Sequence, residues 1–166
     1  FVGAQTIKGG STVYVISGNR DGRVYSMNGT TKALDAKSTS FTALAGNDMD
    51  AGPTFWDNGD GTYNTICIND PGFLVCLDPD MNVIWRRSTG LLVNSSPQAV
   101  LINGTQVLVV CDMAGAVSFF LGDGTLVSQF HVKGGIEGTP YIGNFLTGAD
   151  TGMLITTTDG NVYLYN

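Results

Sequence analysis

The chain has 166 residues, of which 43% are apolar, so it is long and apolar enough to bury the core of one domain. Its net charge of −6 at pH 7, with only eight Lys and Arg residues, argues against a nucleic-acid partner, because phosphate neutralisation needs clustered basic side chains. No apolar stretch reaches about 18 residues, so we expect no membrane insertion. Charged residues make up only 13%, which favours an extracellular or cell-surface location.

One pattern occurs four times along the chain: an apolar run, a tight turn that ends in glycine, and a second, alternating run. The turn glycines are Gly22, Gly72, Gly115 and Gly160, at spacings of 50, 43 and 45 residues. Such a period is typical of a propeller blade or a β-rich solenoid unit. Each copy predicts an antiparallel hairpin that buries its faces against the neighbouring copies.

The repeats divide the chain into four units that together form one domain, at approximately 1–46, 47–92, 93–135 and 136–166. In the first unit only the weak segment 1–6 is available as a first strand. The other three units begin with a proline before a short apolar stretch, at Pro53, Pro97 and Pro140. Proline cannot donate to a ladder, so it marks the start of a strand.

A fourth strand is expected after the hairpin in the first three units, at residues 31–34, 82–86 and 126–130. The last unit ends after its third strand. We therefore predict an all-β fold, a β-propeller of about four four-stranded antiparallel blades, or a segment of a larger propeller. Unpaired strand edges at the two ends predict a protein partner, either by self-association or as further blades of a longer chain.

The chain has three cysteines, so at least one of them cannot form a disulfide within the chain. We expect the turn after Ile68 to set that residue opposite Phe73, so that Cys67 and Cys76 are not directly opposed. We also expect their side chains to point to opposite faces of the hairpin, so that a disulfide between them would need another register. We interpret both, with Cys111, as small buried apolar residues. A zinc site is not expected, because there is no short cysteine spacing and His131 is the sole histidine.

The polar loop 56–64 is the one stretch with the composition of a metal site. Asp57, Asn58, Asp60 and Asn64 offer hard oxygens around a turn that glycine makes tight, as a calcium site requires. The same residues also suit a plain connection between two strands, because glycine allows positive φ there. The sequence therefore favours an ordinary turn, with calcium as the alternative and as the one cofactor that the sequence suggests.

Three Asn-X-Ser/Thr sequons fall in predicted turns or connections, where a glycan would be accommodated on the surface. The acceptor residues are Asn28, Asn94 and Asn103. Turns also select Asn, Gly, Ser and Thr, so the alternative interpretation is turn chemistry alone.

Segments 53–61 and 139–144 resemble the FG-GAP/VCBS propeller repeats of integrin-α-like proteins, and segment 73–85 resembles a blade of the pyrroloquinoline-quinone-like propellers. Both resemblances imply a propeller. The first implies a calcium loop of the form Asp-X-Asn/Asp-Gly-Asp-Gly-X-X-Asp, in which Asn58 and Asp60 match but Trp56 and Asn64 replace the outer acids. The second places Trp85 at the blade-docking tryptophan, with Phe41 and Phe130 at loosely comparable places.

No catalytic constellation is evident in the sequence. His131 has no Ser or Cys partner in a nucleophile motif. The catalytic aspartate that a quinoprotein enzyme would need cannot be picked out either. The sequence therefore predicts a non-catalytic binding or assembly module that recognises protein or glycan. The alternative is a segment of a quinone-like propeller enzyme or of its accessory protein.

Overall fold

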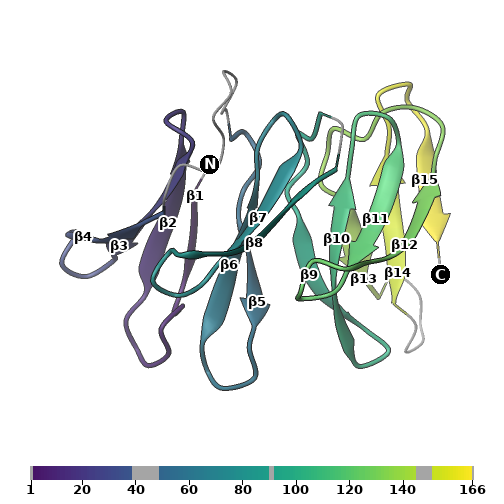
Figure 1. Cartoon of the computed structure of the whole chain (residues 1–166). Helices are drawn as coiled ribbons and strands as arrows, with labels where there is room; N and C mark the ends of the chain where they lie inside the picture. The colour runs from purple at the N-terminus through teal and green to yellow at the C-terminus, as the bar shows by residue number, and fades with distance from the viewer. Residues whose placement is uncertain (1, 39–48, 90–91, 145–150, 166) are drawn as a thin grey trace.

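A computed structural model describes residues 2–38, 49–89, 92–144 and 151–165. These residues form fifteen β-strands and no helix (Figure 1). The strands make four antiparallel sheets that follow one another in chain order, and we call these sheets blades 1 to 4. Phe41 and the rest of 39–48 lie outside the described residues.

Each blade is a meander in which consecutive strands are neighbours. Blade 1 contains β1 (Val2–Gln5), β2 (Tyr14–Asn19), β3 (Arg23–Asn28) and β4 (Leu34–Lys37). Blade 2 contains β5 (Thr54–Asp57), β6 (Tyr63–Ile68), β7 (Phe73–Leu77) and β8 (Val83–Ser88). Blade 3 contains β9 (Gln98–Ile102), β10 (Thr105–Cys111), β11 (Ala116–Phe120) and β12 (Leu126–His131). Blade 4 contains β13 (Tyr141–Gly143), β14 (Gly152–Thr156) and β15 (Val162–Tyr165).

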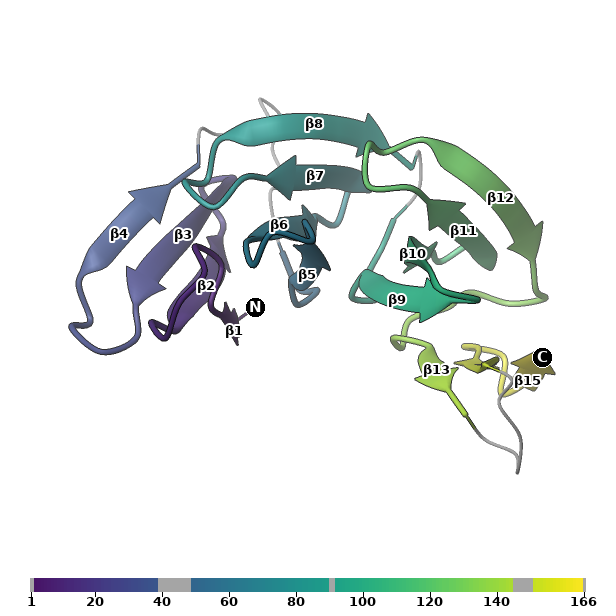
Figure 2. The same ribbon diagram turned by 90° about the horizontal axis from the view of Figure 1, so that it is seen from below.

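The four blades lie around an open arc (Figure 2). The first strands β1, β5, β9 and β13 are on its concave side, and the fourth strands β4, β8 and β12 are on its convex side. The predicted all-β blades are therefore confirmed, and so is the weak first strand, which pairs with β2 from Val2 to Gln5.

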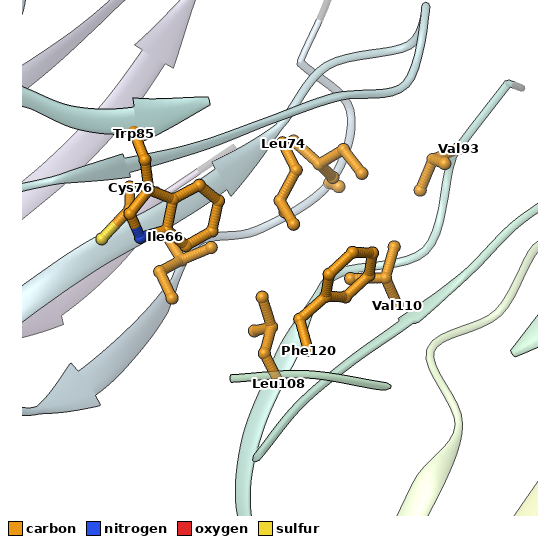
Figure 3. Packing of buried hydrophobic residues seen from close by; sticks show 10 residues of the cluster. Ile66, Leu74, Cys76, Trp85, Val93, Leu108, Val110 and Phe120 are labelled. Carbon is orange, nitrogen blue, oxygen red and sulfur yellow. The ribbon is translucent and has the colours of Figure 1, made fainter. Parts of the chain in front are cut away.

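The core is divided among the three interfaces between successive blades. The interface of blades 2 and 3 buries Ile66, Leu74 and Trp85 against Leu108 and Phe120 (Figure 3). Similar apolar clusters fill the other two interfaces. Because side chains alternate between the two faces of a strand, a middle blade contributes to two clusters at once. This arrangement explains why the middle strands of blades 2 and 3, such as β7 (FLVCL) and β11 (AVSFF), have apolar residues on both faces.

The cysteines show this division, and they also correct the predicted register. Cys67 belongs to the cluster between blades 1 and 2, and Cys76 to the cluster between blades 2 and 3. The predicted opposite orientation is thus confirmed, and all three cysteines are buried and free. The predicted pairing was wrong by one residue, since Ile68 lies opposite Leu74 and Cys67 opposite Val75. The reason is that Asn69 still pairs with the strand after the turn, its N–H donating to the Phe73 carbonyl at 3.3 Å. This observed register turns Cys67 and Cys76 to opposite faces, whereas the predicted one would have left them on the same face.

Two apolar residues of the predicted hairpins are exposed, although these hairpins are expected to bury their faces against the neighbouring blades. Val13 is 45% exposed and lies just before β2, where Ile16 is the fully buried residue. Val162 is 65% exposed on β15, the edge strand of blade 4, while Ile155 of the neighbouring strand is buried. Exposure on an edge strand follows from the absence of a packing partner among the described residues.

Candidate functional site

Trp85 connects blades 2 and 3 at the convex side of the arc. Its indole Nε1 donates a 2.7 Å hydrogen bond to the carbonyl oxygen of Gly122, in the turn between β11 and β12. A Cβ on Gly124 would lie 3.0 Å from the same ring, so only glycine fits beneath the indole without a shift. Trp56 packs on Gly122 in a similar way, at 2.6 Å from an added Cβ. The structure therefore gives Trp85 the docking position that the sequence predicted.

The positions equivalent to Trp85 in blades 1 and 3 follow from the pairing between the third and fourth strands. Trp85 of β8 is paired with Cys76 of β7. The third-strand residues at the same distance as Cys76 from their own turn glycines are Ser26, which is paired with Ala36 in blade 1, and Phe119, which is paired with Ser128 in blade 3. Ala36 and Ser128 are thus the counterparts of Trp85. The predicted comparison with Phe130 was wrong by two residues. The reason is that blades 2 and 3 have the same register and the same β-bulge, so the counterpart lies equally far from the turn glycine in both, whereas Phe130 is two residues farther along β12.

A line of hydrogen bonds that sequence reasoning missed joins the blades on the concave side. The residues involved precede the three prolines that open blades 2, 3 and 4. The Gly52 N–H donates to Ser96 Oγ at 2.7 Å, and the Ser96 N–H donates to Thr139 Oγ1 at 2.9 Å. The signal was present in the sequence, because a hydroxyl-bearing residue stands before two of the three prolines.

The structure places the predicted calcium ligands around the turn between β5 and β6: Asp57 ends β5, Asn58 and Asp60 lie in the exposed loop, and Asn64 is half-buried in β6. Asp57 Oδ1 accepts the Gly59 N–H at 2.8 Å, and Asp60 Oδ1 accepts the Thr62 N–H at 2.9 Å. Asn58 Nδ2 donates to Asn64 Oδ1 at 3.0 Å. The bonds from Thr62 lower the pKa of Asp60.

The described residues contain no group of three or more His, Cys, Asp or Glu side chains that could hold a metal ion. The loop between β5 and β6 therefore offers the two carboxylates of Asp57 and Asp60 together with amide and backbone oxygens. Both carboxylates serve the turn, and calcium binding stays a prediction.

The three sequon asparagines lie in different parts of the fold. Asn28 Oδ1 accepts the N–H groups of Thr30 and Thr31, and Asn94 is half-buried between blades 2 and 3. Asn103 is exposed at the turn between β9 and β10, with a φ of 50°. Glycosylation stays a prediction at all three. His131 is exposed at the end of β12.

Blade 4 differs from the other blades in having three strands instead of four among the described residues. Its third strand β15 is the edge of a three-stranded sheet, whereas β3, β7 and β11 each pair with a fourth strand. Beside β15 lies a cavity of about 360 Å³ between blades 3 and 4, lined mainly by apolar side chains. Tyr165 and Phe130 stand on its wall with ring centroids 4.9 Å apart.

None of the described segments is a helix able to cross a membrane. No protein-family model matches the chain, and no curated protein sequence matches it. Solved structures do share its architecture. BBS1N, solved in complex with ARL6DN, is 15% identical with a TM-score of 0.71, over 99% of this chain and 49% of that chain.

Two further structures are similar. BamB from Moraxella catarrhalis is 19% identical with a TM-score of 0.64, over 96% of this chain and 43% of that chain. A europium-containing methanol dehydrogenase is 15% identical with a TM-score of 0.64, over 94% of this chain and 38% of that chain. All three are β-propellers. This chain has the β-propeller fold. It spans less than half the length of each of these propellers.

Proposed function

We propose that this chain is a non-catalytic β-propeller module, extracellular or at the cell surface, that binds a protein through the outward face of blade 4. One observation carries the proposal. The second residue after each turn glycine is fully buried in blades 1 to 3, as Val24, Leu74 and Val117. The equivalent Val162 of blade 4 is 65% exposed.

Other apolar side chains surround Val162 on the same sheet. Leu164 is 51% exposed and Tyr141 is 59% exposed, and both pair across the ladder with Leu154. Contiguous exposed apolar surface of this kind marks an interaction site. Sugar hydroxyls would find few hydrogen-bonding side chains there, so the face favours protein over glycan.

The occupant that fits is a second β-sheet face with apolar side chains, because the other three interfaces are built in this way. Such a face can come from a second copy of the chain or from further blades of a longer polypeptide. BBS1N offers a supporting comparison, since that propeller was solved in complex with another protein.

The test is sedimentation of the 166-residue chain, whose mass is 17.5 kDa. We expect self-association in the micromolar range, and we expect Val162→Asp to return the chain to a monomer. Val127→Asp is the matched control, since Val127 is 53% exposed on β12 but lies away from this face. A wild-type chain that stays monomeric would refute the second copy as the occupant and leave the further blades of a longer polypeptide. A Val127→Asp effect as large as that of Val162→Asp would refute the proposal itself.

A segment of a quinone-like propeller enzyme or accessory protein is the second candidate. It is favoured by the Trp85 docking contact and by the fold shared with the methanol dehydrogenase. A bound quinone absorbs in the near-ultraviolet and visible, so the absorption spectrum of the native protein decides between the two candidates.

A further inference from the structure

A second cavity lies between the outer strands of blades 2 and 3, away from the blade 4 face. Its volume is about 430 Å³, within the range of about 300–1,000 Å³ that is usual for ligand pockets. Arg87 and Thr89 line it from blade 2, and Ser118, Thr125 and Gln129 line it from blade 3. We call it the β8–β12 groove.

The guanidinium of Arg87 is held in one orientation by backbone oxygens. Nε donates to the Gly124 carbonyl at 3.2 Å, Nη1 to the Arg86 carbonyl at 3.0 Å, and Nη2 to the Asp123 carbonyl at 3.5 Å. The group also lies 6.0 Å from the centre of the Trp85 ring. A guanidinium has five N–H donors, so one remains on each Nη for a ligand.

The charge of Arg87 has no ion-pair partner within 4.0 Å among the described residues. The nearby Asp123 carboxylate accepts the Thr125 N–H at 2.8 Å, and this bond is the first cause of its lowered pKa, with Arg87 a smaller one. The carbonyls that orient the guanidinium are neutral, so they do not form an ion pair with it. Two parallel N–H donors on a fixed guanidinium match the two oxygens of a carboxylate.

The rest of the groove suits a peptide. Gln129 Nε2 donates to Ser118 Oγ at 2.8 Å, which leaves the Gln129 carbonyl oxygen available for an amide N–H, and Phe120 and Leu126 add apolar wall. The two flanking strands, β8 and β12, are both edges of their sheets. Edge strands have backbone groups that an extended chain can pair with.

We propose that the β8–β12 groove binds an extended peptide segment with an acidic side chain, whose carboxylate is held by the two remaining N–H donors of Arg87. This site is separate from the blade 4 face, so either proposal can fail without the other. The net charge of −6 opposes acidic chains over the protein as a whole, so binding has to come from the local contacts of the groove.

The probe is fluorescein-labelled poly-L-glutamate of about 20 residues, with poly-L-glutamine as the neutral control, followed by fluorescence anisotropy at low salt. We expect the acidic peptide alone to bind. Arg87→Gln should weaken binding about tenfold or more, and Arg87→Lys should restore only part of it. Arg20→Gln, which removes the same charge from an exposed turn of blade 1, should leave binding unchanged.

Gln129→Leu supplies a second variant that leaves the Arg87 contacts intact, and it should also weaken binding; circular dichroism verifies that each variant is folded. Val162→Asp should have no effect on this assay. The proposal is overturned if a folded Arg87→Gln binds like the wild type or if Arg20→Gln loses as much. It is also overturned if a hyaluronan octasaccharide binds while poly-L-glutamate does not, because the site would then be one for acidic glycans.

Discussion

The indole nitrogen of Trp85 and the carbonyl oxygen of Gly122 are joined by a 2.7 Å hydrogen bond across the interface of blades 2 and 3. The bond lies between residues 37 positions apart in the chain. It satisfies the one polar atom of the indole while the ring, 9% exposed, fills the cluster at this interface. Blades 1 and 3 have Ala36 and Ser128 at the same position, so this contact is specific to one interface.

Replacing Trp85 should therefore destabilise the fold strongly. We expect Trp85→Ala to lower the free energy of unfolding by about 3–5 kcal/mol, since it leaves a large cavity. Trp85→Phe should cost about 1–3 kcal/mol, because the Gly122 carbonyl loses its donor. Urea denaturation followed by circular dichroism measures both. Ile84→Ala, at the exposed neighbouring position, should change stability by no more than about 0.5 kcal/mol, and an equal loss there would contradict the assignment.

Gly122, whose carbonyl accepts the Trp85 bond, also packs against the indole of Trp56. A Cβ at this position would lie 2.6 Å from the Trp56 ring, so Gly122→Ala must displace the indole or the turn. We expect a loss of about 1–3 kcal/mol in the free energy of unfolding, as for other overpacked sites. Gly138→Ala is the control, because its added Cβ would meet nothing nearer than 3.6 Å. Equal stability of the two variants would show that the turn yields freely.

Lys8 joins blades 1 and 2, where the tryptophan is absent. Its Nζ lies 2.8 Å from an Asp35 oxygen and 2.7 Å from an Asp80 oxygen. The hydrogen bond to Asp35, followed by that to Asp80, raises the pKa of Lys8 above its ordinary value of 10.5. The folded state therefore favours the ammonium, so the contribution to stability is complete below 10.5 and is lost as the pH rises further.

We expect Lys8→Met to lower the free energy of unfolding at pH 7 by at most about 1 kcal/mol, because the pairs are partly exposed. The difference from the wild type should shrink above pH 10.5 and in about 1 M salt, where the Debye length is about 3 Å. Denaturation curves under these three conditions measure it, with Lys37→Met as the control. A difference that persists in high salt would mean that Lys8 acts by packing on Tyr14 rather than by its charge.

The three thiols should be unreactive in the folded protein. Burial raises the pKa of Cys76 and Cys111 to about 12, and that of Cys67 also lies well above its ordinary value of 9.0. We expect no reaction with a thiol reagent at pH 8 in the native state and three equivalents after denaturation without reductant. Because the folded state favours the protonated thiols, stability should fall as the pH rises above about 9. Rapid native labelling, or fewer than three equivalents, would contradict this.

Calcium at the loop of Asp57 and Asp60 remains to be tested. An ion would compete with the N–H groups that these carboxylates already accept, so we expect weak affinity, of about 10⁻⁴–10⁻³ M. Calorimetric titration should give heat that Asp60→Asn removes. Asp123→Asn is the matched control, because that carboxylate caps a similar exposed turn. A titration without heat at millimolar calcium would leave only the turn interpretation.

The hairpin turns were predictable because their determinants are local. Gly22, Gly72, Gly115 and Gly160 have φ between 71° and 84°, a conformation that glycine adopts without strain. The alternation of apolar residues likewise predicted the strands, since its period is a property of the extended backbone. These signals recur at nearly constant spacing, and the spacing was enough to predict the blades.

The sequence by itself thus determined the repeat, the hairpins and the docking position of Trp85. Only the tertiary structure decided which equivalent residues are buried: Val117 and Val162 look the same in sequence, yet one is covered by the next blade and the other is 65% exposed. It also brought Arg87 of β8 against the turn after β11, and so created the groove. Burial and grooves depend on what lies across an interface, and residues more than 35 positions away supply that partner.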